Sequence, residues 1–268
     1  MDLNSIYLPV EKILVDQIMP GYNHPSGIKN AVIVTQPNGE KLIANYCSDK
    51  YFLVKNEDVI EPFKKELEKV YNVGFAIKVF GYTQFHVDFN LLQFGTKILK
   101  NDEIFPRIRL SNSYDGRVRY HFTMGFFRQV CTNGLTAPVG DELKIRKLHT
   151  PSLENLTSFE KVLEMASNFL KSSDKFFGTY FELLDNPVRN LNYRIEDVIE
   201  DTGFPPSLEE DVKSRVSEEM SQLGLSEPND WLVYNAFNYQ LNHNENYKAK
   251  QEKKEEIDVE ILNYLLQY

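Results

Sequence analysis

Alternating apolar and polar residues in the first half of the chain predict strands that pair as hairpins. Residues 31–35 and 41–45 alternate on either side of a turn that contains Asn38-Gly39, and this pair supplies the positive φ values of a tight hairpin. Residues 75–82 and 84–92 are two further strand segments, both rich in aromatic residues. These segments indicate a sheet built from hairpins.

Helical periodicity occurs once in the first half and throughout the second half. Residues 56–71 predict a helix that Asn56 caps, and its apolar stripe consists of Val59, Phe63, Leu67 and Val70. From about residue 152 the chain becomes charged and rich in Leu, Glu and Ser at helical spacing. The expected fold is α+β, with a central antiparallel sheet of hairpins packed with helices and followed by a mainly helical C-terminal half.

Three regions follow from these patterns. Residues 1–151 are the β-rich α+β core, residues 152–247 an acidic helical region packed on it, and residues 248–268 a charged linker with a terminal amphipathic helix. The apolar stripe of the terminal helix consists of Ile257, Ile261, Leu265 and Tyr268. A helix of this length does not hold alone in water, so it docks on its own chain or on a neighbouring subunit. The reach of the linker favours the neighbour, which predicts a homo-oligomer.

The most informative segment is a basic hairpin at the centre of the chain. Residues 105–111 and 117–124 both alternate, and a three-residue loop of Tyr114, Asp115 and Gly116 sorts apolar and polar side chains onto separate faces. The predicted apolar face consists of Ile108, Leu110, Val118, Tyr120, Phe122 and Met124. The predicted polar face consists of Arg107, Arg109, Arg117, Arg119 and His121.

Four guanidinium groups on one face repel each other, so anions must offset them. One source is internal, because residues 97–151 carry ten Lys and Arg against five Asp and Glu, whereas residues 152–268 carry 11 against 23. A second source is the phosphates of a single-stranded nucleic acid, with Tyr or Phe side chains for base stacking. A small anionic ligand is the third. The nucleic-acid hypothesis assigns contacts to Arg107, Arg109, Arg117, Arg119, His121 and Arg128.

Two motifs suggest a family. The first is Ile108-Arg-Leu-Ser-Asn-Ser-Tyr-Asp-Gly116 followed by Phe126–Leu135, and the second is Asp230–Ala236 with His243. Together they resemble the signature of the phage/plasmid-like protein family, a domain of unknown function numbered 932. The matching positions are Asn112, Tyr114, Asp115, Gly116, Cys131, Asn133, Gly134, Trp231 and Asn235. The resemblance implies a mobile element as the source and names no activity.

The motif residues also have a plain structural interpretation. Asn133 and Gly134 tolerate left-handed backbone, which indicates a turn in which Cys131 packs inward. Alternatively, the N–H groups of residues 132–134 form an anion-binding concavity. Trp231 begins a helical stripe that continues through Tyr234 and is more typical of a core than of a stacking platform.

Composition excludes several classes of protein. With 42% apolar and 13% aromatic residues the chain folds. No zinc-ligand spacing, phosphate-binding glycine loop or serine-nucleophile motif occurs, so we predict no metal, cofactor or catalytic residue, although a nuclease using scattered carboxylates stays open. No secretion signal or membrane-spanning segment is evident, which predicts the host cell cytoplasm, and Cys47 and Cys131 are expected as thiols.

The sequence thus favours a non-catalytic nucleic-acid-binding protein of a phage or plasmid, with single-strand annealing in recombination as its specific form. The net charge of −9 opposes nucleic-acid binding on average, but the basic middle of the chain is locally favourable. The alternative is an interaction protein that binds or inhibits a host factor through the acidic helical half. The analogy behind the first hypothesis is at the level of the fold.

Overall fold

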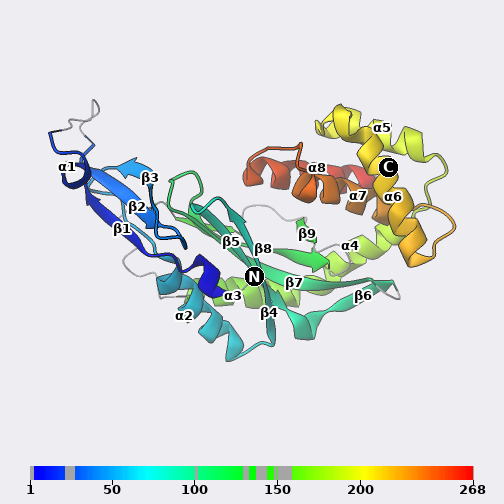
Figure 1. The fold of residues 1–268 in the computed structure, drawn as a ribbon. Helices are drawn as coiled ribbons and strands as arrows, with labels where there is room; N and C mark the ends of the chain where they lie inside the picture. The colour runs from blue at the N-terminus through cyan, green and yellow to red at the C-terminus, as the bar shows by residue number, and fades with distance from the viewer. Residues whose placement is uncertain are drawn as a thin grey trace. The chain divides into compact units, whose positions relative to one another are not determined.

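The computed structural model describes residues 3–21, 28–99, 102–128, 133–136, 144–147, 149 and 159–267. These residues form two antiparallel sheets and eight α-helices, so the fold is α+β with a helical C-terminal half, as the sequence predicts (Figure 1). The chain divides into two units. Unit 1 comprises residues 1–93, 107–123 and 141–167, and unit 2 comprises residues 94–106, 124–140 and 168–268.

The smaller sheet of unit 1 contains the first predicted hairpin. Its strands are β1 (Val10–Leu14), β2 (Asn30–Thr35) and β3 (Lys41–Cys47), in that order, after a short 3-10 helix η1 (Leu3–Ile6) and with α1 (Val15–Ile18) between β1 and β2. Thr35 pairs with Lys41 at the predicted turn. Val15, Ala31 and Ile33 form its small apolar cluster.

The larger sheet contains the remaining strands. They are β4 (Val73–Phe80), β5 (Gln84–Leu91), β6 (Thr96–Leu99), β7 (Asp102–Ser113), β8 (Tyr120–Arg128), β9 (Asn133–Thr136) and β10 (Lys144–Lys147), with the 3-10 helix η2 (Leu92–Phe94) after β5. Their order is β10-β8-β7-β5-β4, while β6 pairs with β7 and β9 with β8. The first residues of β7 belong to unit 2 and the rest to unit 1, and β8 changes unit in the opposite sense.

Helix α2 (Asn56–Glu68) covers the apolar face of this sheet in unit 1 (Figure 1). The Phe63 ring lies 5.2 Å from the Phe89 ring and 4.8 Å from the Phe122 ring. Two predictions for this helix are wrong. Asn56 is its first residue rather than its cap and uses its side chain elsewhere, and Val70 lies beyond the helix with 62% of its surface exposed.

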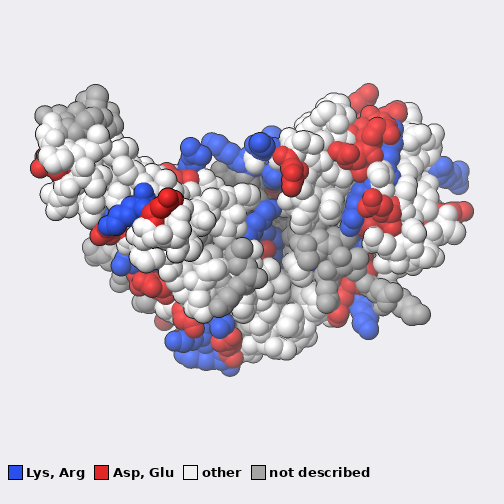
Figure 2. All heavy atoms as spheres, viewed as in Figure 1, with Lys and Arg blue, Asp and Glu red and all other residues white. Residues whose placement is uncertain are grey.

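The described helices of the C-terminal half are α3 (Glu160–Lys171), α4 (Ser173–Asp185), α5 (Leu191–Thr202), α6 (Glu209–Leu223), α7 (Asp230–His243) and α8 (Gln251–Gln267), with the 3-10 helix η5 (Pro206–Leu208) before α6. In unit 2, α7 is central and packs against α4, α6 and α8. Trp231 and Tyr234 are fully buried in it, in agreement with the predicted packing stripe. Exposed carboxylates gather over α5 and α6 (Figure 2).

Helix α8 begins inside the tract expected to be a linker and docks on its own chain. Ile257, Ile261 and Leu265 are at most 2% exposed. Asp258 of the same helix accepts hydrogen bonds from the Tyr234 hydroxyl at 3.2 Å and from Nδ2 of Asn238 at 2.8 Å. The apolar stripe is therefore part of the core of unit 2. Self-association stays a prediction, and the apolar stripe of this helix is already covered within its own chain. Tyr268 lies outside the described residues.

Candidate nucleic-acid interface

The loop between β7 and β8 is longer than the sequence predicts. The strands end at Ser113 and begin at Tyr120, so residues 114–119 separate them rather than three residues. The Ser113 side chain accounts for the difference: its Oγ accepts a hydrogen bond from the Val118 N–H at 3.0 Å and donates one to the Val118 carbonyl at 2.8 Å. Gly116 has a φ of 72°, as expected. Arg117 and Arg119 therefore lie in the loop and not in a strand.

Asp115 of the family signature ties this loop to the neighbouring turn. Its Oδ1 accepts a hydrogen bond from the Arg117 N–H at 2.9 Å, and this bond within the loop fixes the loop backbone between the two residues. Its Oδ2 accepts hydrogen bonds from Oγ1 of Thr83 at 3.1 Å and Nε2 of Gln84 at 2.7 Å. The Tyr114 N–H also donates to the Thr83 carbonyl at 2.7 Å. The β4–β5 and β7–β8 turns are thus joined at one end of the sheet.

Two further signature residues join the loop to helix α2. Nδ2 of Asn112 donates to the Val54 carbonyl and to Oδ1 of Asn56, each at 2.9 Å. The Tyr114 hydroxyl accepts the Asn56 N–H at 3.1 Å. Asn112 and Tyr114 are fully buried, and burial raises the pKa of Tyr114 well above its usual range. The signature is therefore a scaffold that fixes the position of the loop.

A group of exposed or half-buried cationic and aromatic side chains lies at this end of the sheet, in the two turns and at the end of β4, and we call it the cationic tip. It consists of Lys78, Phe80, Tyr82, Arg117 and Arg119. The Arg117 side chain is 78% exposed with its Nε 3.9 Å from Oδ2 of Asp115, and Arg119 is also exposed. Phe80 and Tyr82 are each 42% exposed, and the Lys78 Nζ lies 5.4 Å from the Phe80 ring centroid.

Arg107 and Arg109 lie on the polar face of the sheet, as predicted, but they are buried beside a carboxylate. The Arg109 Nε lies 2.6 Å from Oδ1 of Asp88, and the Arg109 Nη2 lies 2.9 Å from Oδ2. The Arg107 Nη1 lies 3.4 Å from the same Oδ2. Burial raises the pKa of Asp88, but the two guanidinium groups outweigh burial and hold that pKa far below its usual range. The internal partner is on β5 and not in the acidic helical half.

His86 and His121 occupy the same polar face. The Nδ1 of His86 lies 2.7 Å from Oγ of Ser111, and the Nδ1 of His121 lies 2.8 Å from the Arg119 carbonyl oxygen. Burial, reinforced by the positive charge of Arg109, lowers the pKa of His86 well below 6.5. His86 is therefore neutral in the folded protein at neutral pH.

This burial predicts a pH dependence of stability. Unfolded His86 gains a proton below a pH of about 6.5, whereas folded His86 resists it, so its contribution is complete above pH 6.5 and decreases as the pH falls. As the pH falls below 6.5, the contribution of His86 to the free energy of unfolding should decrease by up to about 1.4 kcal/mol per pH unit. Urea unfolding at several pH values between 7.5 and 5.5 measures it. His86→Gln should reduce the slope, and a slope unchanged from the wild type in a folded His86→Gln variant would contradict this assignment.

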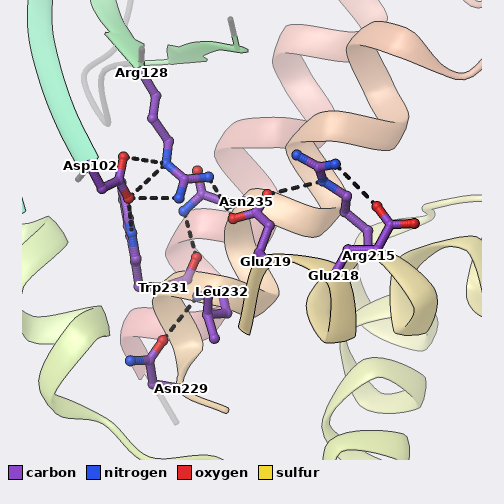
Figure 3. A network of polar contacts seen from close by, with 9 residues as sticks. All are labelled: Asp102, Arg128, Arg215, Glu218, Glu219, Asn229, Trp231, Leu232 and Asn235. Carbon is purple, nitrogen blue, oxygen red and sulfur yellow. Dashed lines mark hydrogen bonds and ion pairs between the residues drawn. The ribbon is translucent and has the colours of Figure 1, made fainter. Parts of the chain in front are cut away.

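Arg128 is the centre of a buried ion network in unit 2 (Figure 3). Its Nη2 lies 2.6 Å from Oδ2 of Asp102, and its Nη1 lies 2.7 Å from Oε2 of Glu219. All three side chains are fully buried. The guanidinium carbon lies 5.3 Å from the Trp231 ring, whose Nε1 donates to Asp102 at 3.0 Å. Here the acidic helical half does supply a partner, Glu219 of α6.

The remaining family positions have mixed outcomes. Nδ2 of Asn235 donates to the Trp231 carbonyl at 2.6 Å inside helix α7. Asn133 and Gly134 lie in strand β9, opposite Arg128 and Phe127, rather than in the expected turn. Cys131 and the predicted concavity around residue 132 lie outside the described residues. Cys47 is a buried free thiol, as expected.

The sequence missed the acidic partners and the aromatic part of the tip. Asp88 alternates in phase with His86 and Asn90, which signals a polar face, but only the strand register shows Asp88 opposite Arg109. Asp102 is the first residue of β7, and nothing in the local sequence pattern links it to Arg128. The phosphate contacts at Arg107, Arg109, His121 and Arg128 stay predictions.

No group of three or more His, Cys, Asp and Glu side chains in the described part of the chain could hold a metal ion, and none of its helices could span a bilayer.

Comparisons with known proteins place the chain in a family. Neither the curated proteins nor the solved structures give a match to this chain. A family model described as "Domain of unknown function (DUF932)" matches residues 45–260. The chain therefore belongs to the DUF932 family, as its two motifs predict.

Proposed function

We propose that the protein is a non-catalytic single-stranded nucleic-acid-binding protein of a phage or plasmid, and that the cationic tip is its binding surface. The observation that carries the proposal is a loop held in place by Asp115 that exposes Arg117 and Arg119 at the same end of the sheet as the exposed rings of Phe80 and Tyr82. Guanidinium groups bind phosphates, and aromatic rings stack with bases of any sequence.

Preorganisation supports this surface. Asp115 and the buried Asn112 and Tyr114 fix the loop before any ligand arrives, so little conformational entropy is lost when the arginines bind. The two exposed aromatic residues belong to the adjoining turn and strand end, which Thr83 and Gln84 connect to Asp115. A single strand can therefore meet cations and stacking surfaces together.

Replacing both loop arginines tests the proposal. Arg117→Ala/Arg119→Ala should weaken binding of a fluorescein-labelled oligonucleotide by about tenfold for each arginine at low salt, because each loses a charge-assisted contact worth about 1.4 kcal/mol. Fluorescence anisotropy measures the affinity, and the loss should be uniform across sequences.

The matched control removes the same charge from elsewhere. Lys171→Ala/Lys175→Ala changes two exposed lysines on α3 and α4 and should retain wild-type affinity. Circular dichroism checks that both variants fold. Equal affinities for the arginine variant and the wild type, with both folded, would exclude the tip as the binding surface.

A second function has one observation in its favour. Exposed carboxylates gather over α5 and α6 (Figure 2). The exposed acidic residues of these two helices include Glu196, Glu200, Asp201, Glu210 and Asp211. Such a surface attracts basic partners, in keeping with a protein that binds a host factor. Absence of oligonucleotide binding together with capture of a basic protein that Glu196→Lys/Glu200→Lys abolishes would favour this second function.

A further inference from the structure

Strand β4 stands at one end of the larger sheet. Among the described residues, β5 is the strand paired with it, and its other edge has no partner. The strand reads Val-Gly-Phe-Ala-Ile-Lys-Val-Phe, with one charge in eight residues, and every residue is half-buried or exposed. Phe75 and Phe80 are 41% and 42% exposed. Long apolar edges of this kind associate with other strands unless the protein protects them.

The hydrogen-bond pattern shows which backbone groups of β4 face outward. The Leu92 N–H donates to the Asn72 carbonyl at 2.9 Å, so these two residues form a hydrogen-bonded pair with β5. Because inward and outward residues alternate along an antiparallel strand, Gly74, Ala76 and Lys78 also point their backbone groups toward β5. The outward groups belong to Val73, Phe75, Ile77 and Val79.

These outward groups are self-complementary. If two copies of β4 run antiparallel with Ala76 opposite Ala76, Val73 meets Val79 and Phe75 meets Ile77, so all four outward residues find outward partners. Centring the pair on Phe75 or Ile77 instead leaves one end of the strand without a strand partner. The central register also places Lys78 opposite Gly74, which keeps the two Lys78 ammonium groups apart.

We propose that β4 is the contact between two copies of this chain, which join their larger sheets into one continuous sheet about a two-fold axis at Ala76. A second copy of β4 satisfies every outward group in one register, and a two-fold contact needs such self-complementarity. The proposal does not depend on nucleic-acid binding. It also replaces the apolar stripe of α8, which is buried within its own chain, as the source of a subunit contact.

Disulfide trapping tests the register. Directly opposed residues that are not hydrogen-bonded have Cα atoms about 4.5 Å apart, within reach of a disulfide. Ala76→Cys should therefore form a covalent dimer on mild oxidation, with a 76–76 link identified by mass spectrometry. Lys78→Cys is the matched control. In this register residue 78 of one copy lies opposite residue 74 of the other, so the two cysteines at position 78 would be four residues, or about 14 Å, apart. A 76–76 link that is absent, or no more abundant than a 78–78 link, would overturn the register.

A proline substitution tests the location independently. Ile77→Pro removes an outward N–H and none of the hydrogen bonds to β5, so the edge strand tolerates it. Light scattering should give a dimer for the wild-type chain and a monomer for this variant, with circular dichroism unchanged. A wild-type chain that is monomeric at all concentrations, or a folded Ile77→Pro variant that stays dimeric, would contradict the proposal.

Discussion

A chain that ends at Lys250 is expected to lose the cooperative folding of unit 2. The deletion removes Ile257, Ile261, Leu262 and Leu265, which are at most 2% exposed. Burial of such side chains stabilises by about 1.5–3 kcal/mol each, so the loss approaches the whole stability of about 5–15 kcal/mol of a typical domain. The deletion also removes Asp258, which accepts hydrogen bonds from Tyr234 and Asn238.

The single tryptophan is the reporter of this change. Trp231 is fully buried in α7, so its emission should shift to longer wavelength when unit 2 unfolds. Hydrogen exchange in β5 should show whether unit 1 keeps its protection. Glu260→Ala, at an exposed position of α8, is the control and should keep the wild-type emission. An unchanged emission and urea midpoint in the truncated chain would show that α8 is dispensable.

Arg128→Ala should be the most destabilising single substitution in the ion network. It leaves the carboxylates of Asp102 and Glu219 buried without the guanidinium that bridges them, and loss of one partner from a buried pair costs about 3–5 kcal/mol. Removal of the stack on Trp231 adds to the loss. Urea unfolding followed by Trp231 emission measures the change.

Arg215 provides the comparison within the same network. Its Nε lies 3.1 Å from Oε1 of Glu219, but its side chain is 12% exposed and Glu219 keeps Arg128 after its removal. Arg215→Ala should therefore cost clearly less than Arg128→Ala. Equal losses of unfolding free energy in the two variants would mean that Arg128 and Arg215 neutralise Glu219 to the same extent. That result would contradict the central role of Arg128.

The sequence predicts local structure well where the pattern is governed by neighbours in the chain. The turn at Asn38-Gly39 fixes the β2–β3 hairpin, and the stripe of Val59, Phe63 and Leu67 is buried as expected. The loop after Ser113 was too short in the prediction because alternation cannot show a side-chain hydroxyl replacing a backbone partner. Local pattern therefore gives the strands but not their ends.

The candidate site depends on partners that are distant in sequence, and this limits its prediction. Arg109 meets Asp88 through the β5–β7 register, and Arg128 meets Glu219 on a helix 91 residues away. The local alternation of apolar and polar residues does not show which distant residue each arginine meets. Asp115 was recognised as a signature residue, but its bonds to Thr83 and Gln84 require the fold. The acidic half was expected to pair with the hairpin arginines, but Arg107 and Arg109 pair with Asp88 of β5 instead.

The salt dependence of oligonucleotide binding tests the central claim most directly. Labelled single-stranded DNA is titrated with the wild-type chain by anisotropy at several salt concentrations, and the logarithm of the association constant is plotted against that of the salt. Two phosphate contacts at Arg117 and Arg119 predict a slope of about −1.4 or steeper, and Arg117→Ala/Arg119→Ala should make it shallower by about that amount. No binding at low salt, or the same slope for the variant and the wild type, would contradict single-strand binding at the cationic tip.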